Sequence, residues 1–218
     1  MKNTVLVLTS TFPRWKNDTT PAFVFELSNR LVNKNRRIIV LAPGDPNASK
    51  KERLGNLEVH RFQYFPLPKL QKLAYGAGII PNVKSSFLAK MQIPNFLMSE
   101  FLSARKLIKK YKPDILHAHW IIPQGILAVF LKKRYKIPLV VTVHGSDLFP
   151  LKNRMFKSIQ KTVLENCDAC TVNSTATKNE IIARFPQFKS KIAVIPMGVD
   201  IKKFSGKTAN KPKKYKNK

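Results

Sequence analysis

A histidine, a glycine, a serine and an aspartate stand together at residues 144–147, directly after an apolar run at residues 138–143 that is typical of a strand. In open α/β sheets, ligands bind at the carboxyl ends of the strands, which is where these side chains would lie. Gly145 would let the main chain approach a ligand closely. Asp147 could orient a substrate hydroxyl or cap the next helix. His144 is either a ligand-facing imidazole or a buried structural one, and the neighbouring glycine favours the first.

A second strand end, at residues 115–120, carries two histidines and a tryptophan. His117 and His119 lie two residues apart, so a strand would point both to the same face. If this strand neighbours the first one, three imidazoles and a carboxylate could bind zinc. We do not expect a metal site, because histidine pairs at this spacing are common. His119 and Trp120 are instead candidates for binding a substrate.

A loop after the first apolar run of the chain reaches the same edge of the predicted sheet. It supplies four candidate binding residues, which are otherwise ordinary exposed loop residues: Ser10, Thr11, Phe12 and Arg14. Arg14 could meet an anionic or sugar ligand. The helix predicted to follow would aim its free N–H groups at the crevice. Ser174 could likewise place an anion at a helix start, although capping that helix is its expected role.

The elements that must position these residues alternate between strand and helix patterns. The predicted strands cover residues 4–9, 37–42, 57–61, 115–118, 139–143, 169–173 and 192–195. The predicted helices cover residues 21–33, 125–135, 152–164 and 174–184. Such alternation favours βαβ units with right-handed crossovers. The predicted fold is therefore α/β and Rossmann-like, with a doubly wound, mainly parallel sheet flanked by helices.

Residues 64–98 interrupt this alternation with four prolines and many apolar residues. A long insertion of this kind is more often functional than idle. The glycines at 76 and 78 do not make a dinucleotide fingerprint, because they follow no strand and lack a third glycine. The next helix has an apolar face with basic flanks: Leu97, Phe101, Ala104, Ile108 and Tyr111, beside Arg105, Lys106, Lys109, Lys110 and Lys112. It either lies on an anionic membrane or covers the sheet with a solvated basic face, and the second is the commoner arrangement.

The chain is strongly basic. Its 218 residues carry 40 Lys and Arg against 12 Asp and Glu, a net charge of +28. Residues 202–218 contribute eight lysines and no acidic residue, which leaves +20 on the rest. This charge favours anionic partners, or it only keeps the surface soluble. Nucleic acid is not an expected partner, because no helix-turn-helix, zinc finger or RNA-binding aromatic pattern is present.

The two cysteines and the apolar segments bear on the compartment. Cys167 and Cys170 have redox spacing, but they begin a predicted strand rather than a helix, so we expect them to pack in the core. So few cysteines suit a reducing compartment. No signal peptide is evident, and no stretch reaches the about 20 apolar residues that span a bilayer. We expect a cytoplasmic protein, either soluble or peripheral on the cytoplasmic face of the membrane.

Taken in order, the motifs resemble the amino-terminal half of family 4 glycosyltransferases, which have the GT-B fold. Each motif is short, but together they run in family order over about residues 3–204. They are Ser10-Thr11-Phe12-Pro13, Lys112-Pro113-Asp114-Ile115-Leu116-His117-Ala118-His119-Trp120, Pro123-x-Gly125, Val143-His144-Gly145-Ser146-Asp147-Leu148, Val172-x-Ser174 and Val194-Ile195-Pro196-Met197-Gly198-Val199-Asp200-x-x-x-Phe204.

This resemblance implies two facing Rossmann-like domains in the full enzyme. The first holds much of the acceptor site, and the second holds most of the nucleotide-sugar site, including a glutamate pair. Residues 1–200 would be the first domain, and residues 201–218 a lysine-rich tail or the start of the second. We therefore expect a truncated gene product, a fragment or one subunit of a split enzyme, with little activity alone.

The resemblance also implies a function and roles. The full enzyme would be a retaining glycosyltransferase that needs no metal or cofactor and takes a nucleotide-diphosphate sugar as co-substrate. A glycan or lipid-linked acceptor would suit the basic helix and the apolar insertion. His144 matches the family histidine that lines the catalytic centre, and His119 and Asp147 match positions near the same cleft. Residues 10–13 stand where family members often carry glycines near the donor phosphates. The alternative is a non-catalytic basic module on the membrane that recruits a separate donor-binding chain.

Overall fold

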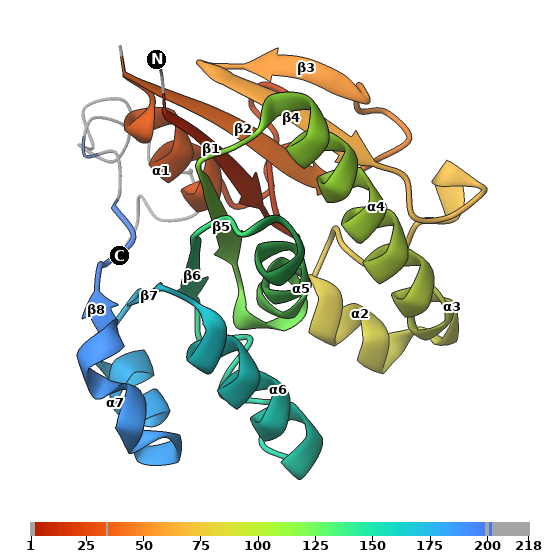
Figure 1. The fold of residues 1–218 in the computed structure, drawn as a ribbon. Helices are drawn as coiled ribbons and strands as arrows, with labels where there is room; N and C mark the ends of the chain where they lie inside the picture. The colour runs from red at the N-terminus through yellow and green to blue at the C-terminus, as the bar shows by residue number, and fades with distance from the viewer. Residues whose placement is uncertain (1–2, 34, 199–200, 202–218) are drawn as a thin grey trace, which may run out of the picture.

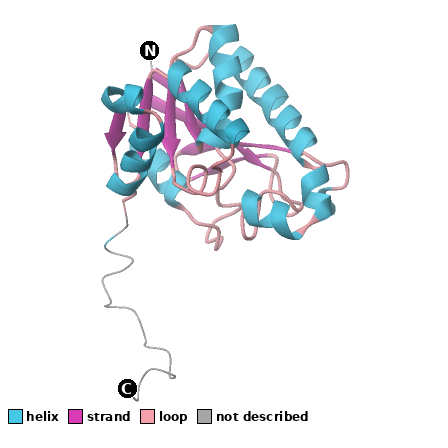
Figure 2. Cartoon of the chain, turned by 90° about the horizontal axis from the view of Figure 1, so that it is seen from below, coloured by secondary structure: helices cyan, strands magenta, loops and turns pink. Residues whose placement is uncertain are grey.

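The computed structural model describes residues 3–33, 35–198 and 201, which form one eight-stranded sheet with helices on both sides (Figure 1, Figure 2). The strand order is β3-β4-β2-β1-β5-β6-β7-β8, and all neighbours are parallel except β3 and β4. The predicted α/β, Rossmann-like fold is confirmed. The order reverses between β1 and β5, and this switch point is where open α/β sheets form ligand crevices.

The strands and helices are as follows. The strands are β1 (Asn3–Leu8), β2 (Arg36–Pro43), β3 (Lys51–Leu54), β4 (Leu57–Phe62), β5 (Ile115–His119), β6 (Leu139–Val143), β7 (Ala169–Val172) and β8 (Ile192–Val194). The helices are α1 (Phe23–Leu31), α2 (Ile79–Ser85), α3 (Phe87–Met91), α4 (Ile93–Tyr111), α5 (Ile126–Tyr135), α6 (Arg154–Asn166) and α7 (Thr175–Arg184). Shorter turns are η1 (Pro68–Leu70), η2 (Ile121–Gly125) and η3 (Pro186–Lys191).

Alternate residues of the central strands enter two separate cores. Leu6 and Leu8 of β1 pack in the larger core, to which α4, α5, α6 and α7 contribute. Val5 and Val7 face the other side and pack with Val24 of α1. A strand covered on both faces needs apolar residues at nearly every position, which is why these runs were recognisable in the sequence.

β3 is the one strand that the sequence pattern did not predict. Its residues read Lys-Glu-Arg-Leu, and it pairs antiparallel with β4 at the edge of the sheet. Short, charged strands are usual at sheet edges because they discourage pairing with other chains. Only Leu54 of this strand is buried, so its apolar signal is too weak to read.

α4 covers the sheet, as the commoner interpretation of its pattern expected. Ala104 and Ile108 are buried in the larger core, while Leu97, Phe101 and Tyr111 are half-buried at its border. The basic flanks are all exposed: Arg105, Lys106, Lys109, Lys110 and Lys112. The helix also buries an acid that the pattern did not predict, Glu100.

The segment 64–98 contains η1, α2, α3 and the first turns of α4. It packs against the larger core through several buried side chains: Tyr64, Leu73, Ala74, Ala89 and Phe96. The Asn82 amide donates to the carbonyls of Leu73 and Tyr75, at 3.0 and 2.7 Å, and so holds the turn ahead of α2. The insertion is therefore a folded layer that extends the core.

Cys167 and Cys170 are free thiols, both buried, and burial raises the pKa of each. This agrees with the predicted role of core packing. Among the described residues, none of the helices combines the length and apolarity that crossing a bilayer would take.

Candidate functional site

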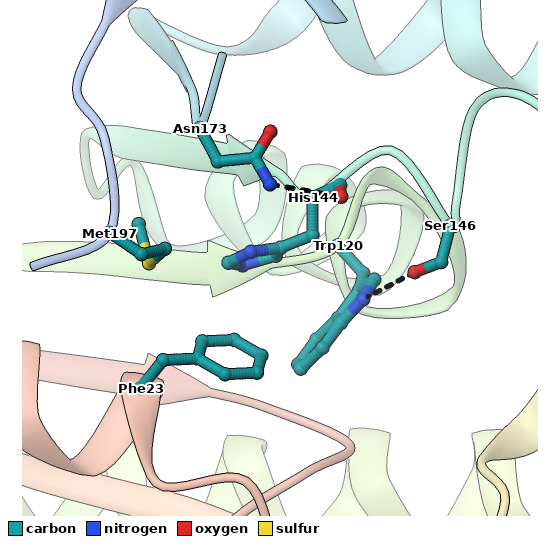
Figure 3. Close-up of a pocket in the computed structure, with 6 residues that line it drawn as sticks. All are labelled: Phe23, Trp120, His144, Ser146, Asn173 and Met197. Atoms are coloured by element: carbon teal, nitrogen blue, oxygen red, sulfur yellow. Dashed lines mark hydrogen bonds between the residues drawn. The ribbon is translucent and has the colours of Figure 1, made fainter. Parts of the chain in front are cut away.

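A pocket of about 280 Å³ lies where β5, β6 and β7 end and α1 begins (Figure 3). The parallel register aligns these ends, with His119 beside Thr142 and Val143 beside Val172. Six residues line the pocket: Phe23, Trp120, His144, Ser146, Asn173 and Met197. It therefore lies at the carboxyl edge of the sheet, beside the switch point between β1 and β5.

The main chain of His144 is fixed from both sides. Its N–H donates to Asp147 Oδ1 at 3.0 Å, and its carbonyl accepts from Asn173 Nδ2 at 3.2 Å. Gly145 follows with a φ of +90°, a left-handed conformation that favours glycine. A Cβ on Gly145 would also lie 3.2 Å from the ring of Phe149. This turn therefore needs glycine to aim the imidazole into the pocket.

The imidazole of His144 lies among other rings. Its Nε2 is 3.0 Å from Nδ1 of His119, and the two rings lie edge to edge, with centroids 5.2 Å apart and planes 20° apart. Trp120 and Phe23 flank it at 4.7 and 5.1 Å. Behind His119 lies the ring of His117, at 4.4 Å. The site is thus a cluster of aromatic and imidazole rings open on one side.

Trp120 holds its place through an uncommon backbone conformation. Its φ is 73°, a region that bulky residues rarely adopt unless the surroundings enforce it. Its N–H donates to the carbonyl of Thr142 at 2.9 Å, and its indole Nε1 donates to Ser146 Oγ at 3.2 Å. The loops after β5 and β6 are therefore joined across the pocket.

The histidines carry no charge at neutral pH. Burial lowers the pKa of His117 and of His144 to about 4, and that of His119 well below its usual range. Asp147 is buried too, and this raises its pKa to about 6 although it accepts main-chain hydrogen bonds that act in the opposite direction. The described lining of the pocket therefore offers hydrogen-bonding groups and ring faces but no fixed charge.

The model of the Glycosyltransferase Family 4 matches residues 21–203. The match covers most of the chain, including strands β2 to β8 and every pocket residue. This chain belongs to the family 4 glycosyltransferases.

Two relatives illustrate the family. An uncharacterized glycosyltransferase of Methanocaldococcus jannaschii is 29% identical over 150 residues, which are 68% of this chain and 40% of that protein. The UDP-Gal:alpha-D-GlcNAc-diphosphoundecaprenol alpha-1,3-galactosyltransferase of Escherichia coli is 34% identical over 113 residues, 50% of this chain and 29% of that protein. The matched segments cover less than half the length of either relative.

Solved structures show the same fold. A glycosyltransferase from Rickettsia africae superimposes with a TM-score of 0.59 and 15% identity, over 98% of this chain and 47% of that one. The Anabaena protein HepE, in complex with UDP and glucose, gives 0.56 and 14%, over 91% of this chain and 45% of that one. The sheet and its helices thus correspond to about half of each of these larger proteins.

Several predicted residues of this family 4 chain lie at the pocket or directly behind it. Trp120 and His144 line it. His119 lies behind His144 and is fully buried. Asp147 caps no helix beyond its loop, since α6 is capped by Asn153; its Oδ2 accepts from the N–H of Ile121 at 2.5 Å. Asp147 therefore joins the loops after β5 and β6.

The first loop, between β1 and α1, does not contribute to the described pocket lining. Phe12 is fully buried against Phe25, and Ser10 is buried as well, while Thr11 is half-buried. Arg14 is paired with Asp18 at 2.8 Å and with Asp45 at 3.3 Å. The charge of Arg14 is thus balanced within the protein, and its anion-binding role stays a prediction.

Ser174 acts as the predicted cap. Its Oγ accepts from the N–H of Thr177 at 3.2 Å, at the start of α7. The neighbouring Asn173 lines the pocket instead, and sequence reasoning missed it. The rule that strand ends carry site residues would have found Asn173 and Met197, which follow β7 and β8. Phe23, at the start of α1, has no comparable signal.

The candidate zinc ligands His117 and Asp147 are bonded to other groups of the protein. His117 Nε2 is bonded to Thr142 Oγ1 at 2.8 Å, and both carboxylate oxygens of Asp147 accept from main-chain N–H groups. Within residues 3–33, 35–198 and 201, no three or more His, Cys, Asp or Glu side chains are grouped to hold a metal ion.

Proposed function

We propose that this chain is the acceptor-side part of a retaining glycosyltransferase that takes its sugar from a nucleotide diphosphate. The observation that carries the proposal is the pocket at the carboxyl edge of the sheet in a family 4 chain, lined by His144 and two aromatic rings. Ring faces with a few directed polar groups are usual in small-molecule sites. His144 would contact the reacting sugar, and Asn173 and Ser146 would supply further polar contacts.

The same pocket lacks what the donor requires. Transfer from a nucleotide-diphosphate sugar places negative charge on the leaving diphosphate, and enzymes stabilise such charge with cations or oriented N–H donors. The described lining has no charged side chain, and Arg14, the cation of the first loop, is paired with two aspartates. We therefore place those donors on a second, donor-binding domain, carried either by the same polypeptide or by another chain. Metal and cofactor have no role in this proposal.

The acceptor in this proposal is lipid-linked or a glycan. The Escherichia coli relative is named for an acceptor attached to diphosphoundecaprenol. An acceptor of that class would bring the chain to the cytoplasmic face of a membrane, where its basic surface would meet anionic lipid.

Complementation tests the division of labour. The purified 218-residue chain is assayed with a panel of nucleotide-diphosphate sugars and a diphosphate-linked glycan, alone and with the donor-binding half of a family 4 relative. We expect no transfer by the chain alone and measurable transfer with the added half. Robust transfer by the chain alone would overturn the incomplete-site proposal. Transfer with neither arrangement, in a chain that binds no acceptor, would overturn the acceptor role.

A second candidate function is membrane docking, and a specific surface favours it. Phe87 and Met91 of α3 and Met98 and Leu102 of α4 are 76, 59, 59 and 50% exposed. Along α4, Met98 and Leu102 continue at helical spacing into the exposed Lys106 and Lys109. Apolar side chains beside lysines suit an anionic lipid surface, because the apolar groups enter the acyl boundary and the lysines meet the anionic headgroups.

Liposome sedimentation tests this surface. Binding should require acidic lipid and weaken as salt rises, since screening reduces the lysine contribution. Serine replacement of Phe87 and Met98 together should release the protein from vesicles. Met155→Ser is the matched control, because Met155 is 60% exposed on α6, away from this surface. Equal binding by all three proteins would contradict the docking surface.

A further inference from the structure

The contact between His119 and His144 has a direction. We propose that His119 is a positioning residue, which donates from Nδ1 to Nε2 of His144 and so leaves His144 protonated on Nδ1, as an N–H donor toward an oxygen atom of the ligand. The two nitrogens are 3.0 Å apart, a normal length for a hydrogen bond between imidazoles.

One proton occupies this contact. Burial lowers the pKa of both rings far enough that neither is charged at neutral pH. A neutral imidazole has one N–H and one bare nitrogen, so one ring must donate and the other accept. The choice fixes the tautomers of both rings at once, because the proton absent from one nitrogen stands on the other.

The far nitrogen of His119 decides the choice. His119 is fully buried, and its Nε2 has no hydrogen-bond partner. If His119 accepted from His144, this Nε2 would carry a hydrogen and become a buried N–H without an acceptor, which is rare in proteins. If His119 donates from Nδ1, only a lone pair is left without a partner. The second arrangement avoids the orphaned donor.

His144 then has its hydrogen on the other nitrogen. Its Nε2 accepts from His119, so the proton stands on Nδ1, which has no hydrogen-bond partner among the described residues. The ring lines the pocket and points toward Met197 (Figure 3). A ligand there would meet an N–H group and would need an acceptor: a sugar hydroxyl or a phosphate oxygen.

The neighbours prevent the pair from turning. The ring of His117 packs against His119 at 4.4 Å, and its own Nε2 is held at 2.8 Å from Thr142 Oγ1. Trp120 and Phe23 hold the faces of His144. The donor direction is thus built into the cluster before any ligand arrives. In this arrangement His144 binds an oxygen through Nδ1 and takes no proton there.

The tautomers follow from the contacts alone, whereas the use of this N–H in sugar transfer rests on the proposed function. Nitrogen NMR of the full chain with ¹⁵N-labelled histidine reads the tautomers without substrate. The chain has four histidines, so replacement of each in turn assigns the signals. At pH 7.5 we expect both His119 and His144 to carry hydrogen on Nδ1 and none on Nε2. A wild-type His144 protonated on Nε2 would overturn the proposal, whatever the transfer assay shows.

Two variants of similar size separate positioning from packing. His119→Asn keeps an amide N–H near the place of Nδ1 and should keep His144 protonated on Nδ1. His119→Leu removes the donor, so Nε2 of His144 should gain hydrogen in a measurable fraction of molecules. An unchanged His144 pattern in the leucine variant would contradict the positioning role. If the leucine variant does not fold, the wild-type and asparagine spectra still decide between the two directions.

Discussion

The loops after β5 and β6 and the first loop, after β1, end at the same edge of the sheet but use their polar groups differently. In the first loop, Arg14 binds Asp18 and Asp45, and Arg61 donates to the carbonyls of Pro13 and Arg14, at 2.8 and 3.1 Å. In the pocket, the internal bonds fix the main chain of His144 and leave its Nδ1 free for a ligand. Polar residues at a strand end thus form a site only where their bonding capacity is not consumed within the protein.

The largest effect should come from the pocket histidine. In the chain complemented with a donor-binding domain, His144→Ala should reduce turnover by about 10²–10³-fold, the usual cost of one lost donor at a reacting oxygen. Steady-state transfer assays measure it. His60→Ala is the control, since His60 contacts Glu58 and Tyr111 on the other side of the sheet. Equal activity of the two variants would contradict the role of His144 in sugar transfer.

Asp147 should matter for the shape of the pocket. Asp147→Ala leaves the N–H groups of Ile121 and His144 without acceptors, which should lower the free energy of unfolding by about 3 kcal/mol. Asp147→Asn retains one acceptor oxygen and should lose less. Urea denaturation measures both. If Asp147→Ala lost less free energy of unfolding than Asp147→Asn, these loops would not depend on the carboxylate.

Arg14 should behave as a structural residue. Arg14→Met keeps the aliphatic stem but leaves Asp18, whose side chain is 1% exposed, without its cation, so we expect a loss of about 2 kcal/mol. Transfer by the folded variant should be unaffected once the protein is saturated with substrate. Arg53→Met, on an exposed edge residue, should change stability by less than about 0.5 kcal/mol. A specific loss of acceptor or donor binding in the Arg14 variant would instead restore its predicted ligand role.

Glu100 also has an oxygen atom without a hydrogen-bond partner, but this residue is fully buried in the interior. Gln124 Nε2 donates to Glu100 Oε2 at 3.2 Å, while the Oε1 atoms of both residues lack partners. Protonation of Glu100 would let its O–H donate to the amide oxygen. Burial raises the pKa of Glu100 to about 8.

A pH titration of stability checks this protonation. A carboxyl whose pKa is higher in the folded state binds a proton that the unfolded chain releases, so stability falls as pH rises from about 4.5 to about 8. The buried histidines contribute a slope of the opposite sign near pH 6.5, because they bind protons in the unfolded chain only. The contribution of Glu100 is therefore the difference between the wild type and Glu100→Gln, and between pH 6.5 and 8 the free energy of unfolding of the wild type should fall relative to that of the variant by about 1 kcal/mol per pH unit. Parallel pH profiles of the two proteins would contradict the protonated state.

Local patterns predicted the fold well because each depends on neighbours in sequence. The apolar runs of β1, β2, β5 and β6 and the spacing of α4 follow directly from burial on one or both faces. Strand β3 was not predicted, because an edge strand needs no apolar pattern. The burial of Glu100 was not predicted either, because helical spacing identifies apolar residues and not an acid that contacts an amide from a distant turn.

The site was predictable in place but not in its full membership. Strand ends located His144 and Trp120, because the topology brings all parallel ends to one edge. The pairing of Arg14 was not predicted, since its partner Asp45 lies beyond the next strand and no local pattern reports such a contact. Phe23 was missed for the same reason: its role depends on how α1 lies against the loop after β6.

The order of the strands also places the pocket at the boundary between two halves of the sheet. Phe23 comes from the first part of the chain, which builds β1 to β4, whereas Trp120, His144 and Asn173 come from the part that builds β5 to β8. A ligand that touches both sides can bind only when the two parts are docked. Its binding energy then adds to the energy that holds them together, and occupancy of the pocket by substrate should protect the whole sheet from unfolding.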